Sequence, residues 1–520
     1  MPELTYDTSA SALAMAELIF GDRVTVTSAT YTGDARASAI YSNGDAISPG
    51  VVPGDTGVIL STGQADRFTN DSGANTNTRT NTTTPNSGPN NDPDFVALAG
   101  RNTFDASYLE VDFIPDPGIE YITLEFVFSS EEYPEFSDSI YNDLFAVWID
   151  GEAVPLAAGS GLASVTNINQ SGDINLFNSN TADQFNTEMD GFTVSMSFVI
   201  PVTPGEVNSL KIGISDVGDS AFDSNVLIAA DSVQGALIAN TDDVLLRPGD
   251  SRIVDVLAND INNTAGVAFI THINDQAVSP GDSVTLTTGQ TVTLNADGTL
   301  TLVGDDVSED VAFTYEIAST TGETAVGFII VDTVPCFVSG TRIRTDRGEV
   351  PVERLQIGDL VRTRDFGLQP VRWIGRRSVP AEGKMAPVHI AANTLGQHDA
   401  LSVSPLHRIL LRNAHAELLY GSSEVLVAAR DLIDGRSVRQ VNGGFVEYVH
   451  LLFDDHQVIW SNGLESESFL PGPQTTGSFD QDLVAELKAI FPELDPATGS
   501  GYGPAARPAL KRYEARLLVA

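Results

Sequence analysis

The excess charge of this 520-residue chain lies almost entirely in its first two-thirds. Residues 1–335 contain 48 Asp and Glu but only 8 Lys and Arg, a net charge of −40. Residues 336–520 contain 22 acidic and 20 basic side chains, a net charge of −2. The break falls at Cys336, the single cysteine of the chain. A chain of this length holds about three domains of roughly 150 residues each, and we infer a domain boundary at this cysteine.

The charge imbalance limits the partners and the location of the protein. An acidic surface disfavours nucleic acid and anionic membranes as partners, because both are polyanions. The chain also lacks an apolar run of about 18 residues that could span a membrane. The composition favours an extracellular, salt-tolerant or calcium-binding β protein at the cell surface or in the medium, with a solvated acidic surface as the alternative. Residues 1–7 lack the basic and apolar regions of a signal peptide, so we expect export without a cleaved N-terminal signal.

Residues 1–236 have the pattern of an all-β domain with long loops. Residues 10–19 are compatible with a short helix, and residues 72–93 are a polar loop rich in Asn, Thr and Ser. Strand-like runs predict strands at 109–113, 121–128, 144–149, 193–199 and 210–214.

Four strings in this region are specific. They are Phe128-Ser-Ser-Glu-Glu-Tyr-Pro-Glu-Phe136, Tyr141-Asn-Asp-Leu-Phe145, Met189-Asp-Gly-Phe-Thr193 and Ile214-Ser-Asp-Val-Gly-Asp-Ser-Ala-Phe-Asp-Ser-Asn-Val226. Together they resemble the choice-of-anchor L domain of bacterial surface and secreted proteins. The resemblance covers most of residues 5–235 and implies a β-sandwich-like extracellular module.

The same strings concentrate carboxylates in tight turns. Ca²⁺ binds roughly six to eight hard oxygen ligands, often on loops, and carboxylates crowded without a cation repel each other. Turns also favour Asp because it hydrogen-bonds its own backbone, so turn formation is the alternative explanation. The candidate calcium ligands are Glu131, Glu132, Glu135, Asp143, Asp216, Asp219 and Asp223. The pattern leaves open which of them share a site.

Residues 237–334 predict a second β unit. Residues 292–302 alternate Val, Leu and Thr around Asn-Ala-Asp-Gly, which is a hairpin pattern. Residues 313–317 and 325–331 predict the closing strands. The element Leu257-Ala-Asn-Asp260 is similar to one in the cadherin-like or immunoglobulin-like repeats of bacterial adhesins. Such repeats act mainly as spacers, sometimes with calcium between domains.

A single cysteine cannot form an internal disulfide, so Cys336 serves either packing or chemistry. Six strings follow it: Cys336-Phe-Val-Ser-Gly-Thr341, Gly348-Glu-Val-Pro-Val-Glu-Arg-Leu-Gln-Ile-Gly358, Asp359-Leu-Val-Arg-Thr-Arg-Asp365, Pro370-Val-Arg-Trp-Ile-Gly375, Leu401-Ser-Val-Ser-Pro-Leu-His-Arg-Ile-Leu410 and Val449-His-Leu-Leu-Phe-Asp-Asp-His456. They resemble the Hint (hedgehog/intein) domain, in the form found in secreted proteins of marine alphaproteobacteria. The resemblance spans residues 335–472 and implies an all-β Hint fold. It also favours a chemical role for Cys336 over a packing role. The whole chain is thus predicted to be mainly β and multidomain.

The resemblance implies an intramolecular reaction. The first residue of a Hint domain attacks the peptide bond before it, and an N-to-S acyl shift converts that amide into a thioester. Cys336 matches this nucleophile. Ser404 and His407 match the family's Thr-x-x-His pair, which contacts the scissile amide. His456 with Asp455 matches the downstream block that assists the later step. A His407 with a near-neutral pKa would be the general acid.

Two departures from the family pattern bear on this reaction. Inteins end in His-Asn, whose Asn cyclises to release the C-terminal piece, whereas residues 461–468 continue into a further tail. We therefore expect no splicing but cleavage on the N-terminal side, in the manner of hedgehog proteins. The residue before Cys336 is Pro335, whose hindered carbonyl forms a thioester reluctantly. Ser404 in place of Thr is a milder change.

The remaining histidines and the tail carry weaker patterns. His389, His398, His415 and His450 have no motif role, and their spacings do not resemble a zinc site. Residues 473–520 predict a helical tail, because 482–491 and 509–518 carry apolar stripes. We expect these helices to pack on the Hint barrel, with a C-terminal export signal as the alternative.

Two functions of different classes follow. In the first, the Hint domain is a single-turnover self-processing element, not a multiple-turnover enzyme, and its substrate is the Pro335–Cys336 bond of its own chain. Cleavage would release or transfer the acidic N-terminal part. In the second, the Hint domain is folded but silent, and the N-terminal domains bind calcium and a cell-surface, glycan or protein partner in adhesion. A cysteine protease acting on other chains is disfavoured, because the motif keeps the scissile bond in the same chain.

Overall fold

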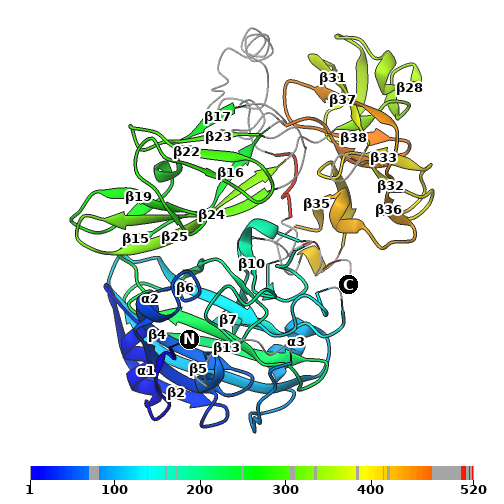
Figure 1. Cartoon of the computed structure of the whole chain (residues 1–520). Coiled ribbons are helices and arrows are strands. Elements are labelled where there is room, and N and C mark those ends of the chain that lie inside the picture. The colour runs from blue at the N-terminus through cyan, green and yellow to red at the C-terminus, as the bar shows by residue number, and fades with distance from the viewer. Residues whose placement is uncertain are drawn as a thin grey trace. The chain divides into compact units, whose positions relative to one another are not determined.

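The computed structural model describes residues 2–69, 81–137, 139–158, 161–170, 172–246, 251–304, 311–332, 336–381, 386–413, 415–417, 422–470, 505–510, 515 and 518. These residues are mainly β (Figure 1). They fall into two compact units. The first consists of Met1–Asp242, Ile253–Leu302 and Val311–Ile330, and the second of Asp243–Arg252, Val303–Asp310 and Val331–Ala520.

Two antiparallel sheets form the body of the first unit. One has the order β1 (Thr5–Asp7), β3 (Ser38–Ser42), β4 (Thr56–Ser61), β14 (Ser224–Ala229), β6 (Tyr121–Ser130), β11 (Gly191–Thr193) and β10 (Phe177–Ser179), with β12 (Met196–Pro201) also paired to β6. The other has the order β2 (Val24–Thr32), β5 (Thr103–Pro115), β13 (Asn208–Val217), β7 (Leu144–Ile149) and β8 (Glu152–Val154), with β9 (Ala163–Ser164) paired to β7.

An aromatic cluster joins the two sheets. Phe126 of β6 and Phe145 of β7 lie with ring centroids 4.6 Å apart, and Phe198 of β12 stacks on Phe126 at 5.2 Å. All three rings are fully or almost fully buried. Because β6 and β7 belong to different sheets, these rings lie between the sheets and form the core of a β-sandwich.

Short helices border the sandwich. They are α1 (Ala12–Ile19), α2 (Gly44–Ile47), η1 (Ala65–Arg67), α3 (Pro93–Ala99) and η2 (Ile174–Leu176). The predicted helix at 10–19 is confirmed by α1. Helix α3 was not predicted, although its signal is local: the Asp92 side chain accepts N–H bonds from Asp94 and Phe95, Pro93 opens the first turn, and Gly100 ends it at φ 66°.

The β unit that follows contains the predicted hairpin. β22 (Thr291–Leu294) and β23 (Leu300–Val303) are joined by a turn in which Asn295 N–H donates to Thr299 O at 2.8 Å. The other strands are β15 (Leu237–Ile238), β16 (Asp242–Leu245), β17 (Ser251–Val254), β18 (Ile261–Asn262), β19 (Ala268–Ile273), β20 (Gln276–Ala277), β21 (Ser283–Thr285), β24 (Val311–Ser319) and β25 (Thr324–Asp332), and η3 (Val256–Ala258) is a short helix among them. The predicted strands at 313–317 and 325–331 lie in β24 and β25.

One strand prediction in the sandwich is wrong. Residues 193–199 form two strands, because β11 ends at Thr193 and β12 begins at Met196. The backbone N–H groups between them bond elsewhere: Val194 donates to Leu176 O at 3.0 Å, and Ser195 donates to Asp275 Oδ2 at 2.9 Å. The other four predicted strands lie in β5, β6, β7 and β13. Residues 81–92 of the predicted polar loop have no helix or strand, and residues 70–80 lie outside the described residues.

Two further sheets form the second unit. One has the order β31 (Trp373–Pro380), β37 (Phe445–Leu452), β26 (Phe337–Val338), β33 (Leu401–Val403), β32 (Val388–Ile390) and β36 (Val438–Gln440). The other has the order β28 (Gly348–Pro351), β27 (Arg342–Thr345), β29 (Leu360–Thr363), β38 (Val458–Ser461), β39 (Leu464–Glu467), β34 (Arg408–Arg412) and β35 (Glu424–Ala428), with β30 (Gly367–Pro370) paired to β29. The short helices η4 (Val352–Arg354) and η6 (Ala429–Leu432) accompany them.

Part of the C-terminal tail packs on this unit. Leu510 and Ala515 are buried in its hydrophobic core, as the tail prediction expected. Ala509, by contrast, forms a parallel bridge with Leu426, so no helix begins at 509. The predicted helix at 482–491 lies outside the described residues. Within the described part of the chain, no helix is long and apolar enough to cross a membrane.

Candidate active site

Cys336 lies at the start of a central strand of the second unit. It directly precedes β26, which pairs with β33 on one side and β37 on the other. The residue is 6% exposed. A cysteine at this point has one neighbouring strand on each side, and its polar contacts come from Ser404, directly after β33, and from His450 of β37.

Ser404 holds the backbone of Cys336. Its Oγ accepts the Cys336 backbone N–H at 2.7 Å, and its own N–H donates to Cys336 O at 3.0 Å. The register explains this, because Phe337 pairs with Val403 and Ser404 therefore lies beside Cys336. The nitrogen that Ser404 contacts belongs to the peptide bond between residues 335 and 336.

His450 lies at the thiol, although no motif role was assigned to it. Its Nε2 is 3.4 Å from Cys336 Sγ. Antiparallel pairing of Phe337 with Val449 places His450 of β37 opposite Cys336. The ring is 8% exposed and packs against Trp373 and Phe469, with centroids 6.3 Å and 5.4 Å away. These contacts hold the imidazole facing the sulfur.

His407 packs against Phe337, the residue that follows Cys336. Its ring packs on Phe337 with centroids 4.3 Å apart, and its N–H donates to Ser404 O at 3.1 Å. Both ring nitrogens are buried and have no hydrogen-bond partner among the described residues. Burial lowers the pKa of His407 to about 4. The expected near-neutral pKa is therefore not found, and His407 is neutral at pH 7.

His456 lies in a separate part of the same unit. Its Nε2 is 3.1 Å from Ser468 O and 3.4 Å from Glu467 Oε2, and its Nδ1 accepts the Ala506 N–H at 3.0 Å. Asp455 is exposed, and no described contact joins it to His456 or Cys336. The carboxylate beside His456 is Glu467.

Glu467 is a buried anion that sequence reasoning missed. It is 1% exposed and accepts bonds from Arg408, at 2.9 Å from the backbone N–H and 3.3 Å from Nη1. Burial alone would raise its pKa, but Arg408 and the hydrogen bond from His456 lower it to about 2. The charge of Glu467 acts on His407, and Glu467 also contacts His456, so the two histidines share this carboxylate.

Two family models match the chain. One, described as the Hint domain, matches residues 335–473, and the other, described as the choice-of-anchor L domain, matches residues 5–234. Residues 335–473 form a Hint domain. Residues 5–234 form a choice-of-anchor L domain.

Solved structures show weaker similarity. The bacterial intein-like domain from Clostridium thermocellum is 18% identical over 26% of this chain and 97% of its own, with a TM-score of 0.19. The gp41-1 intein is 11% identical over 25% of this chain and 97% of its own, with a TM-score of 0.17. The N-terminal eight Ig domains of Down Syndrome Cell Adhesion Molecule are 9% identical over 58% of this chain and 31% of their own, with a TM-score of 0.14. No curated protein matches the chain significantly.

Of the five site residues predicted from the sequence, Cys336 and Ser404 are hydrogen-bonded directly to each other. His407 reaches Cys336 only through Phe337 and Ser404, while His456 and Asp455 make no described contact with it. His450 stands in the same string as His456, but the only signal for its role is strand register across 114 residues.

In the choice-of-anchor L domain the seven predicted calcium ligands separate by exposure. Glu135 is exposed and Asp219 half-buried, whereas the others are buried. Burial is the largest cause of the raised pKa values of Glu132, Asp143 and Asp216, and the charge of Asp143 raises the pKa of the other two further. Burial likewise raises the pKa of Glu131 to about 9 and that of Asp223 to about 6.

Hydrogen bonds satisfy only part of this carboxylate group. Asp143 accepts from the Val217 N–H at 3.0 Å and from Ser224 Oγ at 2.7 Å. Glu132 Oε2 and Asp216 Oδ1 are buried and have no hydrogen-bond partner in the described part of the chain. As placed, no group of three or more His, Cys, Asp or Glu among the described residues could hold a metal ion.

Proposed function

We propose that the Hint domain cleaves the chain between Pro335 and Cys336 in a single turnover, which releases or transfers the acidic residues 1–335. The observation that carries this proposal is the pair of contacts at Cys336. The thiol lies 3.4 Å from His450 Nε2, and the amide N–H of the same residue is bound by Ser404 Oγ at 2.7 Å. Nucleophile and leaving nitrogen each have a polar partner. Pro335 itself lies outside the described residues.

The chemistry balances with these groups. His450 Nε2 accepts the thiol proton, and the thiolate attacks the carbonyl carbon of residue 335. The C–N bond then breaks while the nitrogen takes a proton from the imidazolium, so Cys336 gains a free amine and a thioester on its sulfur. A small thiol or water attacks that thioester and restores the Cys336 thiol. Ser404 orients the amide throughout.

His407 has a different part from the one its motif suggested. A general acid works best with a pKa near the working pH, and a buried histidine with a pKa of about 4 carries almost no proton at pH 7. We assign its neutral ring a packing role against Phe337, while its backbone N–H holds the turn at Ser404.

Intact-mass analysis of the full chain, with and without dithiothreitol, tests the proposal. We expect thiol to produce two species that part between residues 335 and 336, and Cys336→Ala to produce none. A full-length mass under every thiol condition would overturn the proposal and leave the Hint domain folded but silent. Pro335→Gly should raise the rate, because it removes the hindered carbonyl.

His450 is tested separately from the nucleophile. His450→Ala should slow thiol-induced cleavage roughly 100-fold, the usual loss for a group that transfers a proton. His389→Gln is the matched control: His389 lies in the same sheet, on β32, with Nδ1 3.2 Å from Ser402 Oγ and no described contact with Cys336. Equal rates in the two variants would remove His450 from the mechanism.

A second proposal concerns the choice-of-anchor L domain. We propose that it binds Ca²⁺ at Glu132, Asp143 and Asp216, supported by the two buried carboxylate oxygens that lack a partner among the described residues. A buried carboxylate group without a cation holds protons instead, and a divalent ion that takes their place neutralises the same charge. Binding then requires the carboxylates to move from their cation-free positions.

Thermal unfolding at pH 8 in EDTA and in excess CaCl₂ tests the calcium proposal. At 100 times Kd, we expect calcium to stabilise the sandwich by about 2.7 kcal/mol and thereby to raise its Tm. Asp216→Asn should abolish this rise, and Glu135→Gln, which alters an exposed carboxylate, should keep it. Identical unfolding in EDTA and calcium would overturn the proposal.

We further propose that the protein is exported to the cell surface or the medium and binds a glycan or protein partner there. The choice-of-anchor L domain and the net charge of −40 in residues 1–335 support this. Fractionation of producing cells tests it. Protein confined to the cytosol would overturn it.

A further inference from the structure

A short piece of the tail lies beyond the 335–473 match yet is built into the Hint domain. We call residues 505–510 the tail strand. Pro508 O accepts the Leu426 N–H at 2.8 Å, and Leu510 N–H donates to Leu426 O at 2.9 Å. These bonds add the tail strand to the edge of β35 through the bridge between Leu426 and Ala509. Leu510, 7% exposed, joins the Hint core.

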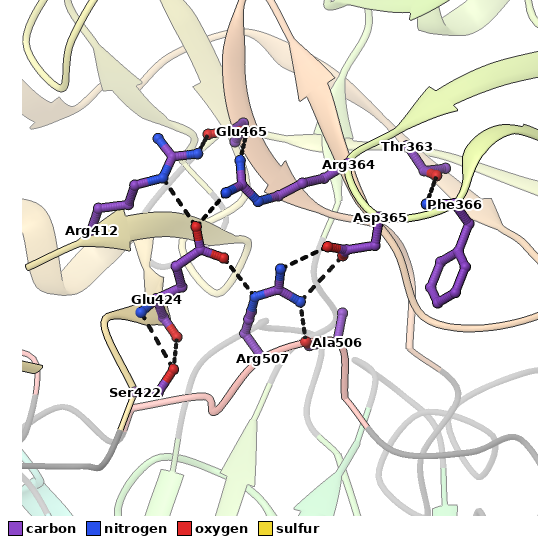
Figure 2. A network of polar contacts seen from close by, with 10 residues as sticks. All are labelled: Thr363, Arg364, Asp365, Phe366, Arg412, Ser422, Glu424, Glu465, Ala506 and Arg507. Atoms are coloured by element: carbon purple, nitrogen blue, oxygen red, sulfur yellow. Dashed lines mark hydrogen bonds and ion pairs between the residues drawn. The ribbon is translucent and has the colours of Figure 1, made fainter. Parts of the chain in front are cut away.

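Arg507 anchors the tail strand. Its guanidinium donates to both oxygens of Asp365, at 2.8 Å and 3.2 Å, and to Glu424 Oε2 at 2.8 Å (Figure 2). Arg364 and Arg412 contact the same Glu424 and also Glu465. Two-oxygen contact with Asp365 fixes the plane of the guanidinium, and Arg507 Nη1 also donates to Ala506 O at 2.7 Å. The anchor therefore fixes the carbonyl of Ala506, the residue whose own N–H faces His456.

Ala506 makes the contact between the tail strand and His456. Its N–H donates to His456 Nδ1 at 3.0 Å. A ring nitrogen that accepts an N–H bond cannot carry a proton, so the neutral ring must carry its proton on Nε2. That nitrogen faces Ser468 O at 3.1 Å and Glu467 Oε2 at 3.4 Å, both of them acceptors. All three contacts thus require the same tautomer.

We propose that the tail strand is a positioning element of the Hint domain. Arg507 anchors it, and its Ala506 N–H selects the Nε2–H tautomer of His456. Its effect on cleavage rests on the function proposed above. His456 donates toward Glu467, and Glu467 is the buried anion whose charge acts on His407. A tail strand that detaches frees Nδ1 to take a proton and leaves the ring free to rotate away from Glu467.

Nitrogen-15 NMR of the histidine rings in the full-length protein tests the tautomer directly. In the wild type we expect His456 to show a protonated Nε2 and an unprotonated, hydrogen-bonded Nδ1. Arg507→Ala removes the anchor and Ala506→Pro removes the N–H itself, and both should move the two ring resonances toward a mixture of tautomers. Arg436→Ala, at an exposed arginine of the same domain, should leave them unchanged.

Thiol-induced cleavage provides the second readout. Both tail variants should cleave roughly tenfold more slowly, the scale expected when a group near the chemistry loses its orientation. Unchanged ring resonances in both Arg507→Ala and Ala506→Pro would overturn the inference. A wild type that shows the expected tautomer but never cleaves would instead overturn the proposed function and leave the tail strand as the element that orients His456.

Discussion

The two units treat buried carboxylates in opposite ways. In the Hint domain Glu467 lies against Arg408, and Glu424 is shared by Arg364, Arg412 and Arg507. The pKa values of both carboxyls are lowered, that of Glu467 to about 2. In the sandwich, Glu131, Glu132, Asp143, Asp216 and Asp223 are buried and every one has a raised pKa. The pKa values of carboxyl groups are thus lowered in one unit and raised in the other.

The difference follows from the supply of cations. Residues 336–520 have nearly as many basic as acidic side chains, 20 against 22, and both Glu467 and Glu424 lie against arginines. The sandwich domain has few, and Lys211 is the single lysine of residues 1–335. Desolvation then acts on its buried carboxylates with no opposing charge, which favours the neutral form. A proton or a bound metal ion must supply what arginine supplies in the Hint domain.

The largest expected effect is a divergence of the two units with pH. Carboxyls with raised pKa values contribute stability that is present below the unfolded values near 4 and is lost as pH rises through the folded values, about 9 for Glu131. Raising the pH from 5 to 9 without divalent ions should destabilise the sandwich by on the order of several kcal/mol. Hydrogen exchange followed by mass spectrometry reads each unit separately. Equal protection of the sandwich at both pH values would break the comparison.

The Hint domain has the opposite dependence. The stability from Glu467 is present above its unfolded pKa and is lost as pH falls toward about 2. Glu467→Gln should lower the free energy of unfolding of the Hint domain by about 3 kcal/mol, because it breaks a buried pair. Urea unfolding at pH 7 measures the loss. Glu417→Gln, at an exposed glutamate, is the control, and an equal effect of the two changes would contradict the arginine-based explanation.

Lys211 is the exception within the sandwich, and it sharpens the comparison. Its Nζ bonds Asp92 Oδ1 at 2.9 Å and Asp94 Oδ2 at 2.7 Å and lies 4.1 Å from the centroid of Tyr108. Lys211→Met should destabilise the sandwich by about 2 kcal/mol through lost ion pairs and cation–π contact. Thermal unfolding measures this loss of stability, and Arg101→Met, at an exposed position, is the control. No difference between the two would show that this lysine adds nothing to stability.

The smallest expected effect is at an exposed pair of the Hint domain. Arg372 contacts Asp454 at 2.8 Å, and both side chains are nearly half exposed. Solvent screens such a pair, so Arg372→Ala should change the free energy of unfolding by less than about 0.5 kcal/mol. Urea unfolding of the Arg372→Ala and Glu467→Gln variants under the same conditions compares the two losses of stability. A loss as large as that of Glu467→Gln would mean that burial does not decide the strength of these pairs.

Local patterns carried most of the fold predictions. Strand-like apolar runs located four sandwich strands, and alternating residues located the 291–303 hairpin. Helix α3 could have been found as well, since Asp92, Pro93 and Gly100 mark both of its ends. The split between β11 and β12 could not, because it depends on Asp275, eighty residues away, which accepts the Ser195 N–H.

By itself, the sequence determined the charge boundary at Cys336, the resemblances to two domain families, and Cys336 and Ser404 as candidate site residues, because each lies in a contiguous run of residues. Only the tertiary structure decided that His450 faces the thiol, that Glu467 rather than Asp455 lies beside His456, and that Ala506 binds that histidine. The physical reason is the same in all three cases. Strand pairing and burial bring together residues that the sequence keeps apart, and no local pattern encodes the register that aligns them.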